Sequence, residues 1–205
     1  YRLYLVTNRY DLSDTEFLAK IDQACTAGVT LVQLREKEVS TRRYYDLAIK
    51  VKQITDRYHV PLIIDDRIDI CLAINAAGVH IGNNELPVQV ARQTLGANKI
   101  LGVSAKSISA AQHAQKSGAD YLGVGAIYPT QTKVVTQHTS ITTLNNIIDT
   151  VDIPVIAIGG ITEHRLESFQ HTKIAGVAMV SELMKSKNIS TKVTNIIKQL
   201  KEVIA

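Results

Sequence analysis

The chain has 205 residues, a length that suits one domain and lies near the lower limit for a complete eight-fold βα barrel. Hydrophobic residues make up 45% of it and charged residues 20%, with a formal net charge of +4, so it can bury a sizeable core. No Lys/Arg block stands out and aromatic residues are few, which argues against nucleic-acid binding. No apolar run could span a membrane and no signal peptide is visible, so we expect a cytoplasmic protein.

Short β-branched apolar runs alternate with longer amphipathic stretches along the whole chain. This alternation predicts eight successive units, each a strand followed by a helix. In chain order the predicted pairs are 3–7 and 14–27, 29–34 and 40–58, 61–64 and 68–76, 78–81 and 87–95, 100–104 and 107–116, 121–125 and 141–150, 154–158 and 163–170, and 176–180 and 190–203. Strands this apolar are covered on both faces, as in parallel sheets.

Eight parallel units in a chain of this length could form a closed barrel or a doubly wound open sheet. The even spacing of the units favours the barrel, and so does the lack of a G-x-G-x-x-G fingerprint at the first helix. We therefore predict an α/β fold, a (β/α)8 TIM barrel with eight parallel strands and outer helices. No linker rich in Pro, Gly or Ser divides the chain, so we expect a single domain over residues 1–205.

Polar residues recur where the predicted strands end, which is where a barrel enzyme carries its catalytic groups. Gln33, Arg35 and Lys37 follow the second strand at alternate positions, so all three point to the same side. A solvated strand end is the alternative. Ser104 closes the fifth strand and points toward the mouth, although a helix-capping role explains it equally well. His80, within the fourth strand, is expected to be a core or barrel-layer histidine with its hydrogen bonds satisfied.

Oxygen-bearing side chains end the third and fourth predicted strands. Asp65 and Asp66 follow the third strand, where a helix N-cap is the simpler explanation. Asn83, Asn84 and Glu85 follow the fourth. One or two carboxylates plus substrate phosphates are the usual ligands of Mg²⁺. A magnesium site between these adjacent strand ends is therefore a hypothesis.

Two further regions have the chemistry of phosphate sites. The polar segment 129–140 follows the sixth strand, and in it Thr130, Thr132 and Lys133 offer two hydroxyls and an ammonium. A polar turn is the alternative there. Gly160 follows the seventh strand and Ser181 the eighth. The loops after strands seven and eight are the usual phosphate cradle of this fold, and glycine lets backbone N–H groups approach an anion closely.

Seven short motifs in this order resemble the thiamine-phosphate synthase family. They are Val32-Gln33-Leu34-Arg35-Glu36-Lys37, Ile63-Ile64-Asp65-Asp66-Arg67, Gly78-Val79-His80-Ile81-Gly82, Gly102-Val103-Ser104-Ala105, Gly123-Val124-Gly125, Ile127-Tyr128-Pro129-Thr130-Gln131-Thr132-Lys133 and Ile158-Gly159-Gly160-Ile161-Thr162. Each motif is weak alone. Their order and their place at successive strand ends make the set specific, and the resemblance covers nearly the whole chain.

The resemblance implies an alkyl-transferring enzyme of thiamine biosynthesis that uses Mg²⁺. Enzymes of that family join a pyrimidine diphosphate to a thiazole phosphate and release pyrophosphate. The substrate-binding residues that the resemblance implies are Gln33, Leu34, Arg35, Glu36, Lys37, Asp65, Ser104, Thr130, Gln131, Thr132, Lys133, Gly160, Val180 and Ser181. Among these it implies catalytic roles for Arg35, Lys37, Ser104 and Lys133. It places Mg²⁺ at Asp66 and Glu85.

The chain departs from the family pattern at three strand ends. Asp65 stands where Asn is usual, Glu85 where Asp is usual and Lys106 where His is usual. A thiazole tautomerase-like isomerase on the same barrel is one rival interpretation, and a non-catalytic sensor of phosphorylated metabolites is another. The retained diphosphate residues, Arg35 and Lys37 among them, favour the synthase. The sequence leaves open whether the chain forms a homo-oligomer.

Overall fold

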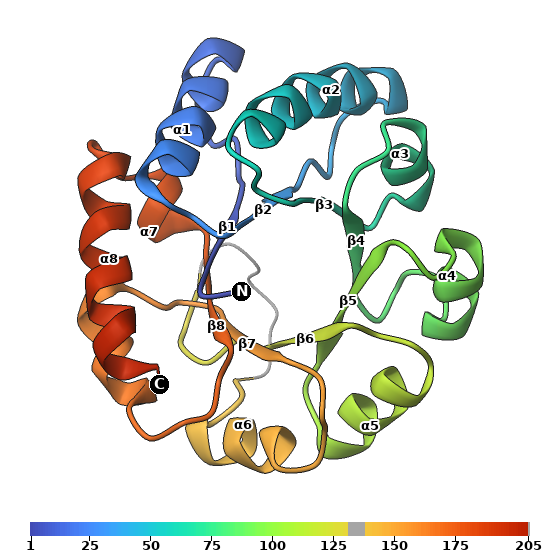
Figure 1. The fold of residues 1–205 in the computed structure, drawn as a ribbon, viewed down its shortest axis with the longest axis vertical. Coiled ribbons are helices and arrows are strands. Elements are labelled where there is room, and N and C mark those ends of the chain that lie inside the picture. Colours follow the sequence, from blue (N-terminus) through green and yellow to red (C-terminus); the bar gives the residue numbers. More distant parts are fainter. Residues whose placement is uncertain (131–137, 205) are drawn as a thin grey trace.

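The computed structural model of the protein describes residues 1–130 and 138–204. Within these residues, eight parallel strands close into a barrel: each pairs with the next in sequence, and β8 pairs with β1. Helices surround the barrel on all sides (Figure 1). The strands are β1 (Leu3–Val6), β2 (Leu31–Leu34), β3 (Leu62–Asp65), β4 (Gly78–Ile81), β5 (Ile100–Ala105), β6 (Tyr121–Val124), β7 (Val155–Ile158) and β8 (Gly176–Met179). The predicted α/β barrel is confirmed.

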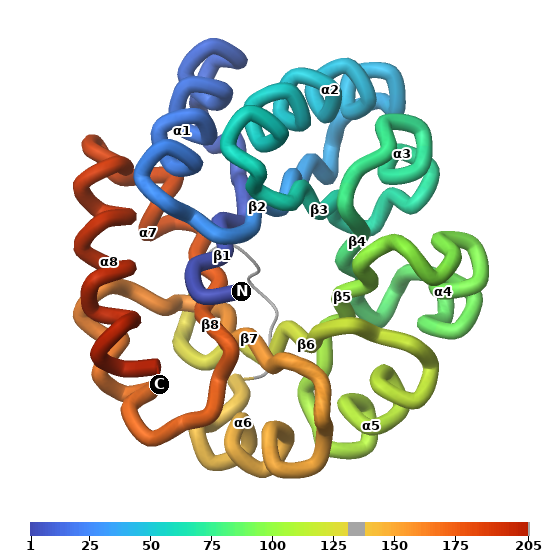
Figure 2. The backbone as a smooth tube through the Cα atoms, viewed as in Figure 1, coloured from blue at the N-terminus to red at the C-terminus, as the bar shows by residue number. Residues whose placement is uncertain are grey.

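The helices lie outside the strands, and α1 packs beside α8, so the two ends of the chain complete the outer ring (Figure 2). They are α1 (Asp14–Ala27), α2 (Thr41–Arg57), α3 (Ile68–Ala73), α4 (Val88–Leu95), α5 (Ile108–Lys116), α6 (Ile141–Ile148), the 3₁₀ helix η1 (Glu163–Phe169), α7 (Ser181–Met184) and α8 (Ile189–Val203). None of the helices in the described part of the chain is both long and apolar enough to cross a membrane.

The last two units differ from the prediction. Residues 163–170 were expected to form an α-helix, but Glu163–Phe169 is a 3₁₀ helix, and its N-cap residue Thr162 makes no side-chain cap hydrogen bond. Short helical runs commonly take this tighter form. The four-residue helix α7 (Ser181–Met184) was not predicted, because it is too short to carry a helical periodicity.

Serine caps fix where several helices begin. Ser13 and Glu16 form a capping box at the start of α1, in which each side chain accepts a hydrogen bond from the other residue's backbone N–H. Ser40, Ser107 and Ser140 cap α2, α5 and α6 with single hydrogen bonds. Because all eight strands are parallel, the residues that end them gather around one mouth of the barrel.

Side chains of each strand alternate between two apolar layers. On β1, Leu3 and Leu5 pack in the large core between strands and helices, whereas Tyr4 belongs to a small cluster inside the barrel. That inner cluster also contains Tyr121, Ile156 and other inward-facing residues. Every second residue of a strand therefore faces the interior, and those nearest the carboxyl ends of the strands face the mouth.

Two glycines make room inside the barrel for large polar rings. A Cβ atom added to Gly102 of β5 would lie 2.1 Å from Cζ of Tyr121. A Cβ atom added to Gly123 of β6 would lie 3.1 Å from Cε1 of His80. The first distance is impossible without movement of the ring, and the second demands only a small adjustment. The lack of side chains at Gly102 and Gly123 thus lets the rings of Tyr121 and His80 fill the interior.

We predict that Gly102→Ala destabilises the protein by about 1–3 kcal/mol, the usual cost of overpacking a well-filled core. The methyl group would force the Tyr121 ring out of its place. Gly123→Ala is the matched comparison and should cost clearly less, because its Cβ meets only the edge of His80. Urea unfolding of both variants measures the difference. Equal losses would mean that the ring of Tyr121 is not constrained at this position.

Candidate active site

A cavity of about 540 Å³ opens at the carboxyl ends of the strands. Such a volume suits small-molecule ligands. The predicted site residues that line it are Gln33, Arg35, Lys37, Asp65, Asp66, Glu85, Ser104, Thr130, Gly160, Val180 and Ser181. They come from the ends of six strands and from the polar segment after β6. The fold therefore brings together residues that are up to 148 positions apart, from Gln33 to Ser181.

Two predicted substrate-binding side chains lie away from this cavity. Leu34 is fully buried in the core between strands and helices, because side chains alternate along the strand and that of Leu34 points away from the barrel interior. Glu36 points away from the cavity for the same reason, and its carboxylate lies 3.2 Å from Nη2 of Arg9. Neither residue therefore lines the cavity. Gln131, Thr132 and Lys133 lie outside the described residues.

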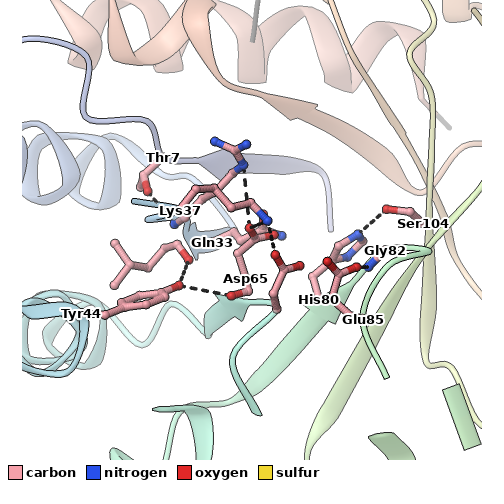
Figure 3. Close-up of polar contacts among 12 residues, drawn as sticks. Thr7, Gln33, Lys37, Tyr44, Asp65, His80, Gly82, Glu85 and Ser104 are labelled. Carbon is pink, nitrogen blue, oxygen red and sulfur yellow. Dashed lines mark hydrogen bonds and ion pairs between the residues drawn. The ribbon is translucent and has the colours of Figure 1, made fainter. Parts of the chain in front are cut away.

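A charged cluster occupies the mouth above β2 and β3 (Figure 3). Nζ of Lys37 lies 2.8 Å from Oδ2 of Asp65 and also makes a close ion pair with Asp66. Nε of Arg35 lies 3.7 Å from the same oxygen of Asp65. Arg35 and Lys37 thus face the acidic pair Asp65 and Asp66, and each cation lies near a carboxylate.

Burial and charge shift the two most tightly coupled groups of this cluster. Burial, with the neighbouring charge of Asp66, raises the pKa of Asp65 above its ordinary value, although Lys37 and Arg35 act in the opposite direction. Burial alone would lower the pKa of Lys37, but the charges and hydrogen bonds of Asp65 and Asp66 outweigh it, so its pKa is raised. Lys37 is therefore a firmly charged ammonium.

The segment that carries Arg35 and Lys37 is anchored from behind. The backbone N–H of Arg35 donates to Oγ1 of Thr7 at 3.0 Å. The hydroxyl of Tyr44, on α2, donates to the carbonyl of Leu34 at 2.7 Å. Together with the Arg9–Glu36 ion pair, these contacts tie the end of β2 to β1 and α2. The two cations therefore project from backbone that is fixed on both sides.

The loops after β7 and β8 form the opposite wall. Gly160 has a φ of +63°, and a Cβ atom there would lie 2.4 Å from the carbonyl oxygen of Pro129, so only glycine fits. Ser181 is the first residue of α7, and the first N–H groups of a helix have no acceptor within it. Lys192 of α8 lies 2.8 Å from Glu163 and 3.2 Å from Glu182, and so ties η1 to α7 behind this wall.

Sequence and structure comparisons identify relatives of this arrangement. A sequence profile described as thiamine monophosphate synthase matches residues 3–183. This chain belongs to the thiamine monophosphate synthase family. It is 58% identical to a thiamine-phosphate synthase of Enterococcus faecalis over 197 residues, which cover 96% of this chain and 93% of that protein. It is 56% identical to thiamine-phosphate synthase 2 of Streptococcus pneumoniae over 204 residues, covering 100% of this chain and 97% of the relative.

A solved structure supports the same assignment. Thiamine phosphate pyrophosphorylase from Pyrococcus furiosus superposes with a TM-score of 0.89 at 32% identity, covering 100% of this chain and 97% of that one. The thiamine monophosphate synthase family is thus matched in both sequence and fold over almost the full length. The resemblance that the strand-end motifs predicted is confirmed.

The acidic residues of the cavity suit a metal ion that takes few protein ligands. Among residues 1–130 and 138–204, no group of three or more His, Cys, Asp or Glu side chains is arranged to hold a metal ion. Asp66 and Glu85 nevertheless line the same cavity, and Asp66 already binds a cation, the ammonium of Lys37. Two carboxylates that leave most positions to substrate phosphates fit Mg²⁺ better than a metal that needs a complete protein cage.

Sequence reasoning missed a hydrogen-bonded row across the barrel interior. Nε2 of Gln33 donates to the hydroxyl of Tyr4 at 2.8 Å, and this hydroxyl lies 2.9 Å from that of Tyr121. The Tyr121 hydroxyl lies 3.0 Å from Nδ1 of His80, whose Nε2 lies 3.0 Å from Oγ of Ser104. His80 faces the barrel interior with satisfied hydrogen bonds, as expected, and it also lines the cavity. The inward position of Tyr4 on an alternating strand was the available signal.

We predict that Asp65→Asn changes how stability depends on pH. The folded state binds the Asp65 proton more tightly than the unfolded state, so the unfolding free energy falls as pH rises from 3.8 through the raised folded pKa. The Asn variant lacks this fall and should be as stable as the wild type or more stable at neutral pH. Urea unfolding from about pH 4 to 7 measures it. Asp11→Asn, at an exposed position, is the control and should leave the curve unchanged.

A steeper loss of stability with rising pH in Asp65→Asn than in the wild type would contradict this assignment. It would mean that the ion pair with Lys37, rather than burial, dominates the titration of Asp65.

Proposed function

We infer that this chain is a transferase of thiamine biosynthesis that condenses a pyrimidine diphosphate with a thiazole phosphate to give thiamine phosphate and pyrophosphate. The observation that carries this inference is the family membership, with relatives named thiamine-phosphate synthase at 56–58% identity over nearly the full length. The cavity supports it, because cationic side chains and a glycine-rich wall face each other across a space that can hold two small phosphorylated molecules.

The pyrimidine diphosphate is assigned to the side of β2, β3 and β5. Arg35 and Lys37 supply the cations for its diphosphate, and the close approach of both to Asp65 supports a shared role. Gln33 and Ser104 lie deeper in the same cavity and would contact the pyrimidine ring. Lys133 is assigned to the diphosphate on the family motif alone.

The thiazole phosphate is assigned to the wall after β7 and β8. Gly160 and Ser181 offer backbone N–H groups, and Val180 lies between them and the interior. Thr130 borders the same cavity from the segment after β6. Gln131 and Thr132 belong to this assignment through the motif. The two substrates would thus approach each other from opposite walls.

The reaction needs charge stabilisation and alignment more than proton transfer. The carbon–oxygen bond to the diphosphate breaks, and pyrophosphate leaves with the electron pair. The aminopyrimidine ring shares the positive charge that develops on the carbon, and the lone pair of the thiazole nitrogen then forms the new carbon–nitrogen bond. Arg35 and Lys37 are suited to stabilise the departing diphosphate. Holding the two substrates in line supplies much of the remaining rate enhancement.

Magnesium is proposed as the cofactor, with Asp66 and Glu85 as its protein ligands and phosphate oxygens as the others. When bound, it would add positive charge beside the leaving group. Lys37 now pairs with Asp66, so Lys37 must give up that partner when Asp66 takes a metal. It would then be available to the diphosphate.

Pyrophosphate release tests the function directly. The protein is incubated with both substrates and Mg²⁺, and pyrophosphate should form only when both substrates are present. A thiazole tautomerase-like isomerase would change the thiazole phosphate alone, and a sensor would bind ligands without turnover. The ion-paired Arg35 and Lys37 favour the synthase over both alternatives, because neither alternative needs a diphosphate clamp.

We predict that Gly160→Ala weakens thiazole phosphate binding but leaves pyrimidine diphosphate binding largely unchanged. A methyl group there would displace the backbone of residues 128–129 and narrow the phosphate wall. Gly96→Ala is the matched control, because Gly96 also has a positive φ but has no atom within 4 Å of its Cβ position. Calorimetric titration of each substrate measures both affinities. Equal losses for both substrates in Gly160→Ala would overturn the division into two walls.

We predict that Mg²⁺ and the pyrimidine diphosphate each bind more tightly in the presence of the other, by about 5- to 150-fold, the usual range for coupled sites. Asp66→Ala should abolish this coupling because it removes a metal ligand. Asp65→Asn should preserve it. The measurement is titration of the diphosphate with and without Mg²⁺ in all three proteins. Loss of coupling in Asp65→Asn but not in Asp66→Ala would assign the metal to Asp65 instead.

A further inference from the structure

The polar row inside the barrel links two residues that face the ligand cavity. Gln33 stands at one end and Ser104 at the other, and both line the cavity. Tyr4, Tyr121 and His80 connect them through hydrogen bonds of 2.8–3.0 Å. Tyr4 and Tyr121 are almost completely buried. Figure 3 shows the contact between His80 and Ser104 at one end of the row and Gln33 across the cavity from them.

The protons along this row run in one direction. Gln33 donates an N–H to the Tyr4 oxygen, so the Tyr4 hydroxyl must donate onward to Tyr121. Burial raises the pKa of both tyrosines, which keeps both hydroxyls protonated. Tyr121 then donates to Nδ1 of His80, and a neutral imidazole that accepts at Nδ1 carries its proton on Nε2.

The two ends of the row therefore have defined and coupled hydrogen-bonding characters. Nε2–H of His80 donates to Ser104, so the hydroxyl proton of Ser104 is available to a ligand. At the other end, the Gln33 amide keeps its carbonyl oxygen and its second N–H for a ligand. Turning the amide over would force the protons of both tyrosines and of His80 to reverse together, and Ser104 would then donate to His80.

The position of Gln33 indicates which part of a ligand it meets. The exposed fraction rises along the inward row, from 4% for Gln33 to 24% and 42% for the side chains of Arg35 and Lys37. Successive residues on one face of a strand are about 7 Å apart, so Gln33 lies deeper than Arg35 and Lys37. A diphosphate bound by these two cations therefore directs its ring toward Gln33. An amide that offers an acceptor beside a donor matches a ring edge with an amino group beside a ring nitrogen.

We propose that Tyr4, Tyr121 and His80 are positioning residues that fix the orientation of the Gln33 amide and make Ser104 a hydrogen-bond donor, so that the site selects an aminopyrimidine over its oxo analogue. The oxo ring presents an acceptor beside an N–H, the reverse pattern. Accommodating it requires the whole row to reverse, which removes the donor at Ser104. The ligand class rests on the proposed function, whereas the direction of the row rests on the hydrogen bonds alone.

The direction of the row is tested by ¹⁵N NMR of histidine in the ligand-free protein, with the His80 signal assigned by its loss in His80→Asn. The wild type should show His80 as the Nε2–H tautomer. Tyr121→Phe should lose this preference, because Nδ1 no longer has its donor. Tyr58→Phe is the control: it also removes a tyrosine hydroxyl, but one that bonds to Asp22 outside the row. It should leave the tautomer unchanged. An Nδ1–H tautomer in the wild type would overturn the proposal.

Selectivity is tested by the ratio of dissociation constants for the aminopyrimidine diphosphate and its oxo analogue. This ratio needs no turnover. Tyr121→Phe should lower the selectivity by at least about tenfold, the scale of one misdirected hydrogen bond, while Tyr58→Phe keeps it. Tyr4→Phe interrupts the row next to Gln33 and should have the same effect, which covers the case of a Tyr121→Phe protein that does not fold. An unchanged ratio in the folded variant would refute the proposal. Selective binding without pyrophosphate release would instead reject only the proposed function.

Discussion

Closure of the eight strands into a barrel points every second side chain into a narrow interior, which side chains must fill. That constraint decides how the interior is filled. Ile63, Ile156 and Ala178 contribute apolar groups to the inner cluster, and the last two also line the ligand cavity. Nearer the mouth the inward row contains Gln33 and His80, whose polar groups must find partners away from bulk water. The hydrogen bonds through Tyr4 and Tyr121 meet this requirement, so the same contacts that stabilise the interior also shape the bottom of the ligand cavity.

Ion pairs, rather than buried hydrogen bonds, hold the side chains at the mouth of the barrel. Lys37 lies between Asp65 and Asp66, where solvent reaches it, and its ion pair with the more exposed Asp66 can be exchanged at small cost because exposed ion pairs contribute little. Asp65 is nearly buried, and its raised pKa records the cost of holding a carboxylate there. The inner wall is thus fixed by satisfied hydrogen bonds, whereas the rim is held by charges that a phosphorylated ligand can replace.

The sequence predicted the barrel because its signals were local and repeated. The apolar runs and the amphipathic stretches that follow them recur eight times at even spacing and agree with one fold. Gln33, Arg35 and Lys37 were placed on one face by their spacing, and all three line the cavity. The side chains of Leu34 and Glu36 lie away from the cavity, because a family motif is contiguous whereas strand geometry turns alternate side chains away.

The row through Tyr4, Tyr121 and His80 could not be predicted from spacing, because it depends on the register between strands that are far apart in the chain. Gly102 pairs with Tyr121 across β5 and β6, and its missing side chain admits the tyrosine ring. The sequence places Gly102 in the fifth predicted strand and Tyr121 at the start of the sixth, and neither placement shows that the two touch. Only the pairing of the strands shows that one makes space for the other.

The balance of positive and negative side chains that line the cavity affects how a phosphorylated ligand binds there. The charged residues that line the described cavity are three cations, Arg35, Lys37 and Lys106, and three carboxylates, Asp65, Asp66 and Glu85. Their formal charges cancel, so a diphosphate entering this space brings negative charge that these residues do not offset. A divalent cation entering with it would restore the balance, and Asp66 and Glu85 are carboxylates of the kind that bind one. Replacing the usual Asn by Asp65 adds one of the three negative charges. This chain should therefore depend on the accompanying cation more strongly than a relative with an amide at that position.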